Sequence, residues 1–187
     1  MKHFNISQFP SELTAADGST VRLCPLWRTK GIPVYCSRNA FFFSYVNATL
    51  RRIKPSRYAP DTAYCSGGRK NYLSIRRKPC CAPCHTLVAL TWIGPRRKGY
   101  QCHHLNGITT DNRADNLIWL SRSRHKRYDA RQKQLQELLG DLRIYNREDF
   151  ERWHAMPEKE FQTMLAKYTE GDPNDRMEYE MTHHMEC

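Results

Sequence analysis

The stretch that most constrains what this chain can fold into is a strand, a long loop, a second strand and a helix in immediate succession. Residues 100–105 and 117–120 are short runs with the apolar content of strands, and the Asn106-Gly107 pair opens the loop between them. A serine after the second run can cap the helix that follows, and Gly140 is a typical helix C-terminus. This order predicts a hairpin with a helix packed across it.

Four polar side chains of this unit are spaced so that they can converge: His103, His104, Asn116 and His125. Neighbouring side chains of a strand point to opposite faces, so His103 and His104 must serve different partners. A helix across the hairpin brings its first turns to the end of the first strand, where His103 and His125 can hold one divalent cation. His104 then faces the other way as a base for water, because imidazole titrates near neutrality. Asn116 can tie the loop to the strand end through its amide, and the set fits metal-assisted hydrolysis of a phosphodiester.

Basic residues are concentrated in the first two thirds of the 187-residue chain. Residues 1–127 carry 22 basic and 5 acidic side chains, whereas the rest carries 8 basic and 14 acidic ones. Because the bases come in tight sets, they indicate a polyanionic partner, most simply nucleic acid, rather than a merely solvated surface. The residues predicted to bind DNA phosphates near the hydrolytic site are Arg96, Arg97, Lys98, Arg122, Arg124, Lys126 and Arg127.

Part of the chain resembles a known nuclease family. GYQCHHLNGITTDNRADNLIWLSRSRHKR looks like the HNH motif of the ββα-metal nucleases, and HTLVALTWIGPRRKGYQ resembles the His-Arg-Leu-Val-Ala segment that precedes this motif in phage- and intron-encoded members. The resemblance implies that His104 is the general base and that Asn116 pins the loop and orients this base. It implies His103 and His125 as the metal ligands. Asn112 matches a second recurrent asparagine of the loop, for which a structural role is implied.

The resemblance, which covers residues 85–131, implies a DNA endonuclease that uses one divalent metal ion. Mg²⁺ or Mn²⁺ is expected, and Zn²⁺ or Ni²⁺ are the alternatives at a site with two histidines. Double-stranded DNA is the expected partner, and a phage or mobile-element enzyme of homing type is the expected setting. The alternative left open is a non-catalytic DNA-binding protein that retains the HNH fold.

The expected fold is α+β: a ββα-metal (HNH) nuclease core, preceded by a small β-rich basic module and followed by short C-terminal helices. Within the β-rich module, residues 27–75 are rich in β-branched and aromatic residues, and they resemble the sheet module that often precedes this nuclease in homing-type enzymes. For residues 85–93 the apolar pattern suits a short buried helix as well as a strand. The expected divisions are an irregular N-terminal arm at 1–26, the DNA-contacting β-rich module at 27–79, the HNH nuclease domain at 80–140, and a helical appendage with an acidic, flexible tail at 141–187.

Three further features have less specific interpretations. His85, at the start of an apolar segment, is interpreted as a packed or capped structural residue. Cys81 and Cys84 have zinc-knuckle spacing without a second such pair, which keeps a zinc-stabilised nucleic-acid-binding module as a third hypothesis. The start of the chain lacks the apolar core of a signal peptide, and no apolar run reaches the length of a membrane span. A soluble cytoplasmic protein is therefore expected, with monomer and dimer both open.

Overall fold

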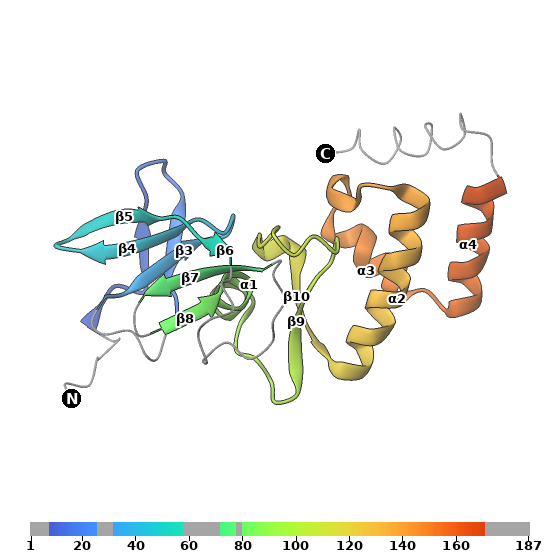
Figure 1. Cartoon of the computed structure of the whole chain (residues 1–187), viewed down its shortest axis with the longest axis horizontal. Coiled ribbons are helices and arrows are strands. Elements are labelled where there is room, and N and C mark those ends of the chain that lie inside the picture. The colour runs from blue at the N-terminus through green and yellow to red at the C-terminus, as the bar shows by residue number, and fades with distance from the viewer. Residues whose placement is uncertain (1–7, 26–31, 58–71, 78–79, 171–187) are drawn as a thin grey trace. The chain divides into compact units, whose positions relative to one another are not determined.

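A computed structural model of the chain describes residues 8–25, 32–57, 72–77 and 80–170 (Figure 1). The fold is α+β, as the sequence predicts. It divides into two compact units, Met1–Lys126 and Arg127–Cys187. The division falls inside one continuous helix, α2 (Arg122–Leu139). Among the described residues, no helix combines the length and the apolar character needed to cross a lipid bilayer.

The first unit begins with a five-stranded antiparallel sheet whose strands pair in chain order. Its strands are β1 (Glu12–Thr14), β2 (Thr20–Leu23), β3 (Val34–Ser37), β4 (Phe42–Val46) and β5 (Thr49–Ile53). Side chains alternate across β3 and β4, so Tyr35 and Phe43 enter one apolar cluster while Cys36 and Phe42 enter another. The sheet is therefore buried on both faces near its centre.

The first two strands correct the expectation of an irregular arm over residues 1–26. Leu13 of β1 lies opposite Val21 of β2, and Val21 is fully buried. Gly18, with φ +80°, permits the turn between these strands, and the Asp17 carboxylate accepts hydrogen bonds from the backbone and side chain of Ser19. Each strand is too short for its alternation to stand out in the sequence, and pairing with β3 supplies the missing stability.

A second sheet leads into the hairpin unit. Its three antiparallel strands are β6 (Ser56–Arg57), β7 (Leu73–Arg77) and β8 (Cys80–Pro83). Helix α1 (Cys84–Val88) and a π-helical turn (Ala89–Ile93) follow. The segment 85–93, for which the sequence left helix and strand open, is therefore helical. Their apolar side chains share one core with Phe42 of the first sheet and Leu117 of the hairpin.

Specific contacts also join the β-rich module to the hairpin unit, so the chain does not divide at residues 79/80. The indole Nε1 of Trp92 donates a hydrogen bond to the Cys36 carbonyl over 3.2 Å. The backbone N–H of Ala114 donates to the Arg38 carbonyl over 2.9 Å, and Arg38 forms an ion pair with Asp115 at 2.6 Å. The two predicted modules therefore form one unit.

The predicted hairpin and helix are present. Strand β9 (Tyr100–His104) pairs with β10 (Leu117–Ser121), and in this register His104 lies opposite Leu117. A loop joins them and closes with a 3₁₀ turn at Ala114–Asn116. Helix α2 follows β10 directly and ends before Gly140, whose φ of +76° is the left-handed conformation expected after a helix.

The second unit contains the later turns of α2, then α3 (Arg147–Ala155) and α4 (Glu158–Glu170). A capping box opens α3, because Asn146 accepts a hydrogen bond from the Asp149 N–H while the Asp149 carboxylate accepts one from the Asn146 N–H. Leu135 of α2, Trp153 of α3 and Phe161 of α4 are buried. The predicted acidic tail beyond residue 170 lies outside the described residues.

Candidate active site

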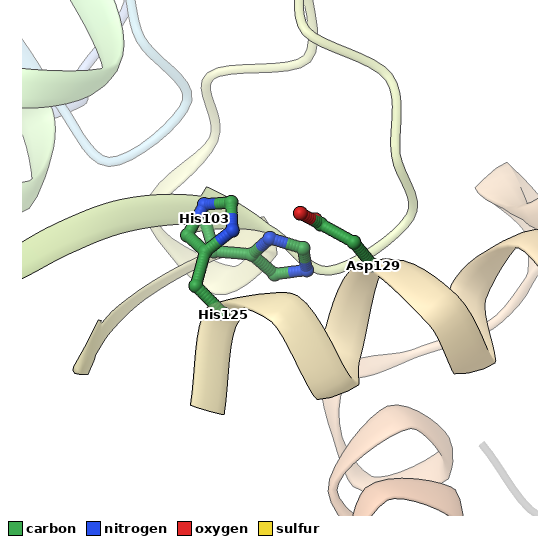
Figure 2. Close-up of side chains that lie close together, drawn as sticks. All are labelled: His103, His125 and Asp129. Carbon is green, nitrogen blue, oxygen red and sulfur yellow. The ribbon is translucent and has the colours of Figure 1, made fainter. Parts of the chain in front are cut away.

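Two histidines from different elements meet at the junction of β9 and α2. His103 is the penultimate residue of β9 and is 4% exposed, and His125 lies in the first turns of α2. Their ring centroids are 4.8 Å apart, with the rings nearly perpendicular (Figure 2). The sequence predicts this pair as metal ligands, and the structure places the two imidazoles together.

A third side chain, Asp129, joins this pair. It follows His125 by four residues on the same continuous helix, so both side chains lie on one helical face. Potential ligand atoms of His103, His125 and Asp129 all lie within 4.8 Å of one another, and the carboxylate points toward the two imidazoles (Figure 2). Sequence reasoning missed Asp129, although its spacing of four from His125 was a usable signal.

The donor set of these three residues suits a divalent cation. Imidazole nitrogen and carboxylate oxygen together bind Mn²⁺, Zn²⁺, Ni²⁺ and related ions, and the carboxylate makes the set better for Mg²⁺ or Mn²⁺ than two neutral histidines would be. A set of three protein ligands also leaves coordination positions for water and a phosphate oxygen. The chemistry of the side chains therefore fits the kind of ion that the sequence predicts.

His104 has separate partners on the other face of β9. Its Nε2 lies 3.0 Å from Oδ1 of Asn112. The Asn112 amide is oriented by its Nδ2, which donates a hydrogen bond to the Thr110 carbonyl over 3.3 Å, so its oxygen faces the imidazole. The hydrogen-bond network thus assigns the proton of the neutral ring to Nε2 and leaves Nδ1 as the acceptor.

The surroundings of His104 favour its neutral form. The residue is 5% exposed, and burial lowers the pKa of its imidazole below the usual value. The hydrogen bond with Asn112 and the charge of Asp111 act in the opposite direction but are the smaller effects. A neutral imidazole is the form required of a general base.

Asn116 ties the loop to the end of β9. Its Oδ1 accepts a hydrogen bond from the Asn106 N–H over 3.0 Å, and its Nδ2 donates to Oδ1 of Asn106 and to the Asp111 carbonyl, each over 2.8 Å. These contacts match the loop-pinning role that the sequence predicts. The direct contact with His104, however, is made by Asn112, so any orientation of His104 by Asn116 acts through the loop.

His85 lies beside this group. Its ring centroid is 5.3 Å from that of His104 and 5.0 Å from that of Tyr72. Burial, with a smaller contribution from the charge of His104, lowers the pKa of His85 to about 4. These contacts are compatible with the predicted role of His85 as a packed residue. They also place His85 next to His104, which the sequence does not predict.

The basic residues predicted to bind phosphates are all exposed. Arg96, Arg97 and Lys98 occupy the turn before β9, whereas the others lie at the start of α2. Arg127 also donates a hydrogen bond to the His154 carbonyl over 3.3 Å, so part of its guanidinium serves the second unit. Of the two predicted zinc-knuckle cysteines, Cys84 is fully buried in the apolar core, which indicates packing, and the side chain of Cys81 lies outside the described part.

Comparison with known proteins gives one match. Residues 83–127 match a family model described as HNH endonuclease. The matched segment runs from the end of β8 to the first turns of α2 and includes His103, His104, Asn116 and His125. Neither a curated protein nor a solved structure matches the chain.

Proposed function

We propose that the chain, whose residues 83–127 match the HNH endonuclease family model, hydrolyses phosphodiester bonds of double-stranded DNA with the help of one divalent metal ion. The observation that carries the proposal is the division of β9 between two sets of partners. On one face His103 joins His125 and Asp129, and on the other a neutral His104 is held by Asn112. A ligand set and a base side by side are the two parts that hydrolysis of a phosphodiester requires.

In this proposal His103, His125 and Asp129 hold the ion, for which Mg²⁺ or Mn²⁺ is the first choice and Zn²⁺ or Ni²⁺ the alternative. When bound, such an ion neutralises charge that develops on the phosphate and stabilises the leaving oxygen. The carboxylate of Asp129 adds an oxygen ligand, which Mg²⁺ and Mn²⁺ prefer to nitrogen. Asp129 therefore favours Mg²⁺ or Mn²⁺ over Zn²⁺ or Ni²⁺.

His104 acts as the general base through Nδ1. Its Nε2–H donates to Asn112, which fixes the ring plane and the tautomer, and Nδ1 takes a proton from the attacking water. Asn116 acts on His104 indirectly. Its side chain binds the Asp111 carbonyl and so fixes the position of the neighbouring Asn112. Asn112 and Asn116 are therefore proposed as positioning residues for His104.

The exposed basic residues are proposed to bind the DNA backbone on either side of the cut. Phosphate contacts from lysine and arginine position a nuclease on the duplex without reading its sequence. The β-rich module adds Arg51, Arg52 and Lys54, all exposed on or next to β5, to the same function. A homing role in a phage or mobile element belongs to this proposal too, and it rests on the likeness of the residues before the motif to phage- and intron-encoded members.

The direct test is cleavage of supercoiled plasmid DNA with Mg²⁺ or Mn²⁺, with and without a chelator. The wild-type protein should convert the plasmid to nicked or linear product only with the metal, and His104→Ala should slow the reaction by about 10²- to 10⁴-fold. Gln101→Ala, an exposed change on the same strand, is the matched control and should cleave normally. Equal rates for wild type and His104→Ala would refute the assignment of the base.

The same assay separates the alternative function. When the assay is repeated with Zn²⁺ and Ni²⁺ and DNA binding is measured by gel shift, a protein that binds DNA but never cleaves it with any of the four metals would be a non-catalytic DNA-binding protein of this fold. Nicked product alone would show that one chain cuts one strand, whereas linear product at early times would indicate paired active sites.

A further inference from the structure

A second imidazole stands next to the proposed base and has no part in the mechanism described so far. The rings of Tyr72, His85 and His104 form a triangle, with centroid separations of 5.0 Å between Tyr72 and His85, 5.3 Å between His85 and His104, and 6.0 Å between Tyr72 and His104. The edge-to-face arrangement of His85 and His104 places the two imidazoles at an interplanar angle of 73°. A phosphate that is within reach of a water on His104 therefore comes close to His85 as well.

The two ring nitrogens of His85 are in different situations. Nδ1 is shielded from solvent and, within the described part of the chain, makes no hydrogen bond. His85 as a whole is only half-buried, so the accessible edge of the ring is the one that carries Nε2. Because an unpaired lone pair is better tolerated inside a protein than an unpaired N–H, the proton of the neutral ring belongs on Nε2.

His85 is also neutral near pH 7, since burial lowers its pKa to about 4. A neutral donor has an advantage over lysine or arginine at this place. It can bind a phosphate oxygen without adding a positive charge against His104, which must remain able to accept a proton. If packing were the whole role, phenylalanine or leucine would fill the same space without leaving a ring nitrogen unsatisfied.

We propose that His85 is a further catalytic residue, whose Nε2–H donates a hydrogen bond to a non-bridging oxygen of the scissile phosphate. The inference rests on the proposed nuclease function and names one more group in the same site. The hydrogen bond strengthens as the phosphate gains charge in the transition state, so it accelerates cleavage more than it tightens binding. The substrate contact is made from a different element than the metal ligands, because His85 belongs to α1.

Three substitutions test the contact. His85→Phe keeps an aromatic ring but removes both nitrogens. His85→Gln can place an amide N–H near the position of Nε2, whereas His85→Asn can reach only the position of Nδ1. Each variant is measured for the cleavage rate at saturating protein, the protein concentration that gives half-maximal rate, Mn²⁺ affinity by calorimetry without DNA, and far-UV circular dichroism.

We expect His85→Phe and His85→Asn to lower the saturating cleavage rate by about 10²-fold, the usual effect of removing one preorganised donor to a developing oxyanion. The half-saturating concentration, Mn²⁺ affinity and circular dichroism should stay at wild-type values, and His85→Gln should recover most of the rate. Wild-type rates in His85→Phe would overturn the inference, and so would equal losses in all three variants accompanied by altered circular dichroism.

The proposed function can fail separately from this inference. If wild type cleaves, His104→Ala does not and His85→Phe does, then only the role of His85 is refuted. If wild type fails to cleave with every metal while binding DNA, the nuclease proposal is refuted and the role of His85 is refuted with it.

Discussion

Acid should destabilise the second unit through one buried histidine, His154. The residue is 1% exposed, its ring stacks on Tyr128 at a centroid distance of 3.6 Å, and neither ring nitrogen has a hydrogen-bond partner among the described residues. Burial is the main cause that lowers its pKa from 6.5 to about 3, and the charges of Arg131 and Arg127 add to it. Protonation of His154 in the folded state is therefore strongly disfavoured.

The sign of the pH effect follows from the protons bound in each state. Between pH 6.5 and about 3, the unfolded chain binds a proton at this histidine and the folded chain does not, so the free energy of unfolding falls as the pH falls. At pH 5 the loss is about 2 kcal/mol relative to pH 7, because each pKa unit is worth about 1.4 kcal/mol. The contribution is fully present above pH 6.5 and is progressively lost below it.

The groups around His154 define the control. Arg127 and Arg131 come from α2, and Arg131 is itself paired with the exposed carboxylate of Glu158 at the start of α4, at 2.8 Å. Protonation of Glu158 and other carboxylates also lowers stability in acid, so wild type alone cannot isolate His154. His154→Phe keeps an aromatic ring against Tyr128 but cannot take a proton, and it leaves the other groups in place.

The assay is urea unfolding at pH 7 and pH 5, followed by far-UV circular dichroism. The drop in the free energy of unfolding between these pH values should be about 2 kcal/mol larger in wild type than in His154→Phe. At pH 7 the variant should be at least as stable as wild type, since it removes two buried nitrogens that lack partners. Equal drops in the two proteins would refute the reasoning.

Three further predictions concern the proposed site. Asp129→Ala should weaken Mn²⁺ binding, measured by calorimetry, by at least about tenfold. Glu137→Ala, an exposed change on the same helix, is the control and should bind Mn²⁺ with wild-type affinity. Equal affinities in the two variants would remove Asp129 from the ligand set. Asn112→Ala should lower the cleavage rate by about 10- to 100-fold without changing Mn²⁺ affinity, because the His104 ring loses its hydrogen bond to the Asn112 side chain. A wild-type rate would contradict the positioning role of Asn112. Replacing Arg96, Arg97 and Lys98 together by glutamine should weaken DNA binding and reduce the slope of log affinity against log salt by about 2.7, and an unchanged slope would exclude phosphate contacts there.

The sequence predicts those parts of the fold that depend on local signals. Asn106-Gly107 marks the start of the loop after β9, and Gly140 marks the end of α2. Each of these residues stabilises a turn or a helix end through its own backbone or side chain, so no distant contact is needed to interpret it. The short strands β1 and β2 were missed because their stability comes from β3.

The same distinction holds within the site. His103, His104 and His125 are recognisable because adjacent histidines before a turn, followed by a helix, form a pattern along the chain. Asp129 is one of two acidic residues on α2, and although it follows His125 by four residues, its nearness to His103 appears only in the folded chain. The contact of Asn112 with His104 depends on how the loop closes, which the two loop asparagines alone do not reveal.

The two faces of β9 also explain why metal binding and base catalysis can be tested separately. On the face of His103 the partners come from α2, and on the face of His104 they come from the loop and from α1. A change at Asp129 therefore alters the ligand set without touching the hydrogen bond that holds His104. Changes at Asn112 or His85 alter the surroundings of the base and leave the three ligands in place. Metal affinity should consequently fall in the Asp129 variant and stay at the wild-type value in the Asn112 and His85 variants, which is the outcome expected only if alternation along the strand divides the two tasks.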